Sequence, residues 1–161
     1  MGKLKYLILA VTTLFLLTTC KKNDQDSSRE VEYIVFGHFY GECVGKDCID
    51  IFKMDCCHIY EDTNDFYPNM IDPYKASYIE LDSRERDSVS FLIYRIPHVL
   101  FFETARFIGQ PDAADQGGLY VEIKCVGKPV QYWFIDQNKA NIPSYLHTFV
   151  DDINKAVKLL M

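Results

Sequence analysis

The chain has 161 residues and a formal net charge of −6, with 17 Lys and Arg against 23 Asp and Glu. This length is enough for one hydrophobic core and short for two. No run of Lys or Arg forms a basic stripe, which argues against nucleic acid as a partner. A modestly acidic surface indicates solubility and points to no particular ligand.

The first nineteen residues, MGKLKYLILAVTTLFLLTT, predict a lipoprotein signal peptide. Lys3 and Lys5 form a short basic region, and residues 6–17 form an apolar run that is well under the roughly 20 residues of a membrane-spanning helix. The run ends in LLTTC, where a leucine and two small residues precede Cys20. We therefore expect cleavage before Cys20, lipidation of that cysteine and firm anchoring in a bilayer. An ordinary secretory signal with an incidental cysteine is the alternative.

Residues 20–30, CKKNDQDSSRE, predict a flexible tether behind the lipidated cysteine. They contain no apolar side chain after Cys20, so burial cannot offset the entropy lost on ordering. Leader, cysteine and charged stretch together resemble lipoproteins of the Bacteroidetes type, in which such a stretch favours display on the cell surface. The resemblance implies a lipid-anchored protein of the bacterial envelope, in the outer membrane, facing the surface or the periplasm.

Residues 31–161 predict a single α+β domain. Segments rich in β-branched and aromatic residues predict strands at 31–40, 48–54, 59–62 and 75–81, and a hairpin of 117–125 with 130–136. Residues 63–73 contain Asn, Asp and two prolines and predict a turn-rich connection.

Two further segments have helical spacing. The first begins with a capping box of Asp82 and Glu85 and ends before Pro97; its apolar positions are Val89, Leu92, Ile93 and Ile96. The second opens at Pro143 and has an apolar face made of Leu146, Phe149, Val150, Ile153, Val157 and Leu160. We expect a mainly antiparallel sheet of five or six strands with these two helices packed on one face.

Cys43 and Cys48 bracket a turn between the first two predicted strands. Exported thiols tend to oxidise, which favours a disulfide. Zinc knuckles mostly have shorter gaps and a second pair of ligands, and free thiols are the third alternative. The prediction is a Cys43–Cys48 disulfide, which contributes about 2 kcal/mol for so short a loop.

The roles of Cys56, Cys57 and Cys125 stay open at this point. Residues 55–58, DCCH, predict a turn that leads into the strand at 59–62. Neighbours on a strand point to opposite faces, so on a strand Cys56 and Cys57 would not serve one purpose together. One of them could pair with Cys125, or each could be a thiol without a bond, since cysteine is often buried in that state. A thiol-redox or metal-dependent enzyme that uses the region from Cys43 to His58 is one alternative function.

Other candidate chemistry is sparse. Asp112 and Asp115 lie in a glycine-rich turn without the ligand spacing of a calcium loop, and EDTND (61–65) predicts a solvated turn. The histidines show no metalloprotease spacing. We predict no catalytic residue, no metal site and no cofactor. Trp133, between two other aromatic residues, is the place where an exposed aromatic face is expected.

The stretches FGHFYGECVGKDCIDIF, YEDT, IGQPDAADQGGLYVEI, WFID and IPSYLHTFVDDINKAV resemble small lipoproteins of the Bacteroidetes type that carry a Cys-turn-Cys α+β domain of unknown function. The resemblance implies no activity. The sequence as a whole predicts a non-catalytic binding or interaction module that is held to the bilayer through acylated Cys20 and contacts an envelope protein or glycan. An inhibitor or immunity lipoprotein is a close variant.

Overall fold

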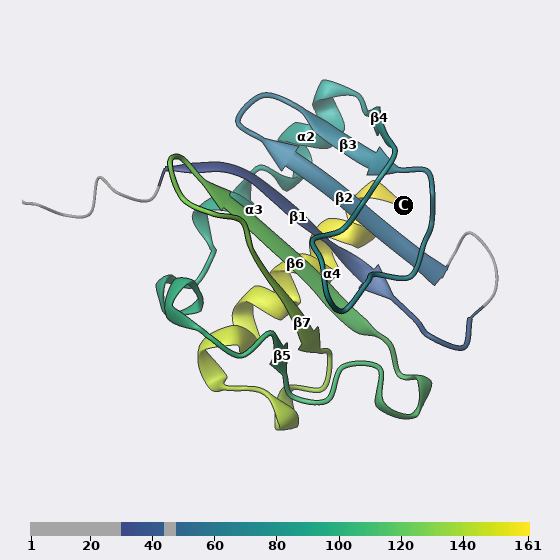
Figure 1. Cartoon of the computed structure of the whole chain (residues 1–161). Helices are drawn as coiled ribbons and strands as arrows, with labels where there is room; N and C mark the ends of the chain where they lie inside the picture. Colours follow the sequence, from purple (N-terminus) through teal and green to yellow (C-terminus); the bar gives the residue numbers. More distant parts are fainter. Residues whose placement is uncertain (1–29, 44–47) are drawn as a thin grey trace, which may run out of the picture.

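Seven strands form one sheet in the computed structural model, which describes residues 30–43 and 48–161 (Figure 1). They are β1 (Val31–Phe39), β2 (Ile49–Asp55), β3 (Ile59–Asp62), β4 (Tyr78–Glu80), β5 (Phe107–Ile108), β6 (Gly118–Cys125) and β7 (Gln131–Asp136). Their order across the sheet is β4-β3-β2-β1-β6-β7-β5. The predicted signal peptide (1–19), Cys20 and the tether up to residue 29 lie outside the described residues.

The sheet is antiparallel throughout except for β5, which runs parallel to β7. The predicted α+β class and the mainly antiparallel pairing are therefore confirmed. The predicted count of five or six strands was too low. The missed strand, β5, has only two residues, which is too short to show any alternation of apolar and polar side chains.

The central strand β1 is buried on both faces. Ile34 and Phe36 point to one side of the sheet, Val35 and Phe39 point to the other, and each is at most 2% exposed. Since both faces of β1 are apolar, each needs a cover that excludes water.

Helices cover one face of the sheet. They are α2 (Ser83–Val89), α3 (Phe91–Tyr94) and α4 (His147–Leu160), with short 3-10 turns at η2 (His98–Phe102), η3 (Ala113–Asp115), η4 (Lys139–Asn141) and η5 (Ser144–Leu146). In the described part of the chain, no helix combines the length and apolar character of a bilayer span.

The predicted capping box is present at the start of α2. The Asp82 side chain accepts from the backbone N–H of Arg84, and the Glu85 side chain accepts from the backbone N–H of Asp82 at 2.8 Å. The first predicted helix is divided at Ser90, whose hydroxyl donates to the carbonyl of Asp87, into α2 and α3.

The predicted apolar face of the last helix packs on the sheet. Its buried residues join the cluster that contains Ile34, Phe36 and Trp133; those from this helix and the turn before it are Leu146, Phe149, Val150, Ile153, Ala156 and Val157. Pro143 precedes the 3-10 turn η5, after which α4 begins at His147.

An extended segment, residues 63–77, covers the opposite face. Figure 1 shows the chain between β3 and β4 crossing the side of the sheet away from α4. Met70 and Tyr74 pack against a second apolar cluster that includes Val35, Ile51 and Tyr120. The sequence predicted turns here, and we call residues 63–77 the covering segment because they bury this face.

Candidate functional site

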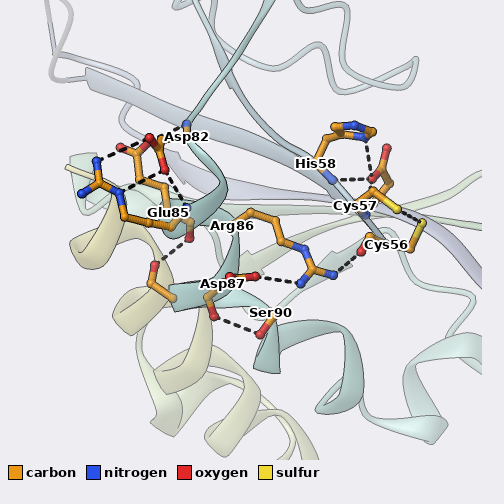
Figure 2. Close-up of polar contacts among 11 residues, drawn as sticks. Cys56, Cys57, His58, Asp82, Glu85, Arg86, Asp87 and Ser90 are labelled. Carbon is orange, nitrogen blue, oxygen red and sulfur yellow. Dashed lines mark hydrogen bonds and ion pairs between the residues drawn. The ribbon is translucent and has the colours of Figure 1, made fainter.

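The turn between β2 and β3 carries two exposed thiols on a hydrogen-bonded backbone (Figure 2). Asp55 ends β2, and its Oδ1 accepts from the backbone N–H groups of Cys57 and His58, both at 2.7 Å. The backbone N–H of Asp55 donates to the carbonyl of His58 at 3.1 Å. Nδ1 of His58 also lies 3.4 Å from Oδ1 of Asp55. These contacts fix the positions of Cys56 and Cys57 between the strands.

Cys56 and Cys57 face each other, with their Sγ atoms 2.9 Å apart. The expectation that neighbouring cysteines point to opposite faces was wrong, because that rule holds for strands and both residues lie in the turn. Cys125 is buried in β6 and forms no disulfide with either residue, so the alternative pairing with Cys125 was also wrong.

Helix α2 contacts this turn through Arg86. Its guanidinium donates to the carbonyl of Cys56 and, at 3.1 Å, to the carboxylate of Asp87 (Figure 2). Nε of Arg86 is buried and finds no hydrogen-bond partner among the described residues. Cys56 and Arg86 line a hollow of about 350 Å³ together with Tyr94. The positive charge of Arg86 thus lies beside the backbone of Cys56, where it is paired with Asp87.

The electrostatics of the turn keep the carboxyl ionised and the first thiol protonated. Burial alone would raise the pKa of Asp55, but the hydrogen bonds from Cys57 and His58 outweigh it, and the net effect lowers that pKa. The hydrogen bond to Cys57, with some desolvation, raises the pKa of Cys56. Because the thiolate is the nucleophile, Cys56 is poorly suited to attack a substrate at neutral pH.

The predicted Cys43–Cys48 pair lies at the other end of β2. The two sulfurs are at bonding distance and the Cα atoms are 5.5 Å apart. The turn residues 44–47 lie outside the described residues. Seven residues of β2 separate Cys48 from Cys56, a span of about 25 Å at 3.3 Å per residue. The region from Cys43 to His58 therefore holds two separate groups of cysteines and cannot form one redox or metal centre.

Asp62 is a buried anchor for the covering segment. The predicted solvated turn at 61–65 was wrong for this residue, which is 4% exposed. Its carboxylate accepts from the hydroxyl of Tyr74 at 2.6 Å and from the backbone N–H of Ser77 at 2.7 Å. It also accepts from the N–H groups of Asn64 and Asp65. Because its carboxylate accepts hydrogen bonds from four donors, Asp62 has a structural role in holding the covering segment.

Glu122 on β6 has a similar role on the same face. It is 4% exposed and accepts from the hydroxyls of Tyr33 at 3.0 Å and Tyr120 at 2.6 Å. The Tyr120 hydroxyl in turn accepts from the backbone N–H of Tyr74 at 2.9 Å. Burial and the charge of Glu122 raise the pKa of Tyr33 and Tyr120, so both hydroxyls stay protonated donors.

Asp112 ties three loops together. Its carboxylate accepts from the backbone N–H groups of Gly41 at 3.2 Å and Gly117 at 3.0 Å, and from the hydroxyl of Tyr67 at 2.9 Å. Burial, with the hydrogen bond to Asp112, raises the pKa of Tyr67 to about 12. Asp112, like its neighbour Asp115, has a positive φ. The turn that carries both aspartates is thus hydrogen-bonded to the loop after β1 and to the covering segment.

Exposed apolar side chains gather around the covering segment. The predicted exposed aromatic face at Trp133 was wrong, since Trp133 is 2% exposed beneath the helices. Of the large apolar residues that are exposed, four lie in or beside the covering segment, and we call them the apolar surface patch: Phe66 (65%), Tyr67 (41%), Ile71 (75%) and Phe107 (47%).

Contacts hold the members of the patch near one another. Arg106, next to Phe107, donates to the carbonyl of Ile71 at 3.1 Å. Phe107 stacks on Phe134 with ring centroids 5.2 Å apart, and Phe39 contacts both Phe134 and Tyr67. Sequence reasoning missed the patch because Phe66, Tyr67 and Ile71 lie among turn-forming residues without periodicity.

No protein-family model, no curated protein and no solved structure matches this chain. The functional argument therefore rests on the geometry of these sites.

Alkylation of the full chain with a chelator and without reductant tests the assignment of the cysteines. We expect modification of the exposed Cys56 and Cys57, and none of Cys43 and Cys48. After reduction Cys43 and Cys48 should also react, and the free energy of unfolding should fall by about 2 kcal/mol while the domain stays folded. Peptide mass spectrometry and chemical denaturation give both readouts. Rapid alkylation of Cys43 or Cys48 before reduction would contradict the disulfide.

Proposed function

We propose that this protein is a lipid-anchored, non-catalytic binding module of the bacterial cell envelope that recognises an envelope protein or glycan. The proposed anchor is acylated Cys20, supported by the leader that ends in LLTTC and by the polar residues 21–29 that follow it. The observation that carries the binding role is the apolar surface patch on a covering segment that buried hydrogen bonds hold in place.

The patch has the physical character of a recognition surface. Contiguous exposed apolar side chains on a soluble domain mark interaction sites, and aromatic residues dominate the binding energy of protein interfaces. Phe66 and Ile71 are among the most exposed large apolar residues of the described chain. Tyr67 and Phe107 add rings that already contact the buried aromatic residues Phe39 and Phe134.

The backbone under the patch is preorganised. The hydroxyl of Tyr74 donates to Asp62 at 2.6 Å and lies 3.0 Å from the carbonyl of Phe66, an alternative acceptor for the same proton, so the two ends of the segment around Ile71 are held together. The Ile71 carbonyl accepts from the Tyr132 hydroxyl at 2.5 Å. Because these bonds exist before a partner arrives, association would lose less conformational entropy. A hollow of about 150 Å³ between Phe66 and Lys75 offers polar groups beside the rings.

A thiol-dependent activity is the second candidate, and the exposed Cys56–Cys57 pair is the observation that favours it. We rank this activity second, because the raised pKa of Cys56 disfavours the thiolate that a nucleophilic role of this residue needs.

The proposed anchor predicts the behaviour of a Cys20→Ala variant. Without the thiol there is no acceptor for the acyl chains, so the variant should accumulate as unprocessed or soluble protein and lose labelling by radioactive palmitate. Cys125→Ala, which removes a thiol of the folded domain, serves as the labelled control. Palmitate labelling that persists in Cys20→Ala would refute the lipoprotein assignment.

The proposed binding role predicts that the double variant Phe66→Ser/Ile71→Ser loses its partner. Each side chain is exposed, so their removal should leave the fold intact while capture from an envelope extract by the immobilised protein falls at least about tenfold. Val126→Ser removes a 54% exposed apolar side chain from the β6–β7 turn and should leave capture unchanged. Quantitative mass spectrometry and glycan analysis of the eluates measure the effect. Equal capture by both variants, or repeated recovery of no protein and no glycan, counts against the proposal.

A further inference from the structure

We propose that the β2–β3 turn is a binding site for a thiophilic divalent cation of the zinc class, held by Sγ of Cys56, Sγ of Cys57 and a carboxylate oxygen of Asp55. This site is separate from the apolar surface patch and does not depend on a binding partner.

The three ligand atoms are already close together. A sulfur or oxygen ligand from each of these residues lies within 4.8 Å of the others. In a tetrahedral site with metal–sulfur bonds of about 2.3 Å, two sulfurs are separated by about 3.8 Å. The observed Sγ–Sγ distance of 2.9 Å needs to widen by roughly 1 Å to reach this value. Both side chains are exposed, so a small rotation about their side-chain bonds provides it.

Hydrogen bonds hold the backbone of the turn that carries these ligands. Oδ1 of Asp55 is engaged by the N–H groups of Cys57 and His58, which leaves Oδ2 as the ligand atom that we assign. His58 contacts the same carboxylate and acts as a positioning residue, in the way that outer hydrogen-bond partners orient metal ligands. The backbone of Cys56 is held from the other side by Arg86.

The charges of the site suit a divalent ion. Two thiolates and one carboxylate carry three negative charges and a divalent cation neutralises two, which leaves one negative charge near Arg86, whose guanidinium also pairs with Asp87. Binding replaces the two thiol protons: the cation and two thiols give a metal dithiolate and two protons, with no change of oxidation state.

The test uses the full chain in detergent, in a Cys43→Ser/Cys48→Ser background so that reduction exposes no competing thiols at the other end of β2. The reduced protein is titrated with Zn²⁺ without oxygen, and bound metal is counted by native mass spectrometry. We expect one ion per chain and protection of Cys56 and Cys57 from alkylation until a chelator is added. Wild-type protein purified without reductant should bind the same single ion.

Four variants then separate ligation from folding. Cys56→Ser and Cys57→Ser should each lower the affinity on the order of 100-fold. Asp55→Asn keeps the Oδ1 acceptor that holds the turn and should lower affinity by about tenfold. Cys125→Ser, which changes a buried thiol outside the turn, should leave the affinity for Zn²⁺ unchanged.

The proposal is overturned if the reduced chain binds no ion at tenfold excess, if binding persists without both thiols, or if Cys56 and Cys57 oxidise to a disulfide in the presence of Zn²⁺.

Discussion

The buried carboxylate of Asp62 holds the covering segment against the sheet directly, and that of Glu122 does so through the Tyr120 hydroxyl, which accepts from the backbone N–H of Tyr74. The burial of one whole face of the sheet depends on these contacts. Burying a carboxylate is costly unless donors surround it, and here hydroxyls of Tyr33, Tyr74 and Tyr120 supply part of that shell. Without the covering segment, the face of β1 that carries Val35 and Phe39 would be open to water. The helices cannot replace the segment, because they pack on the opposite face.

The same contact explains why the apolar surface patch is exposed. The covering segment buries Met70 and Tyr74, and its hydrogen bonds fix the direction of the chain around them. Phe66 and Ile71 are then left pointing to solvent. The strand β3 links this region to the thiol turn, since Cys57 and His58 precede the strand and Asp62 ends it. Four residues therefore separate the proposed cation site from the anchor of the proposed binding surface.

The sequence predicted those parts of the fold that are encoded by local patterns. The strand at residues 48–54, the capping box at Asp82 and the apolar face from Leu146 to Leu160 are each encoded by residues close together in the chain. The covering segment depends instead on pairs far apart in the chain, such as Tyr67 with Asp112 and Tyr74 with Tyr120. No local pattern marks Asp62 as buried or Phe66 as exposed. At Cys56 and Cys57 the sequence indicated a turn, but the rule for neighbouring strand residues was applied to them and placed their side chains on opposite faces.

Native-state hydrogen exchange at the backbone amides of Tyr74 and Ser77 tests the central contact most directly. The Tyr74 amide donates to the Tyr120 hydroxyl at 2.9 Å, and the Ser77 amide donates to the Asp62 carboxylate at 2.7 Å. Both amides therefore report on the contacts that hold the covering segment. If the segment is a fixed cover, both amides should exchange at least about a thousandfold more slowly than in an unstructured peptide. Exchange of both at the rate of an unstructured peptide would show that the segment leaves the sheet freely, and would contradict the account.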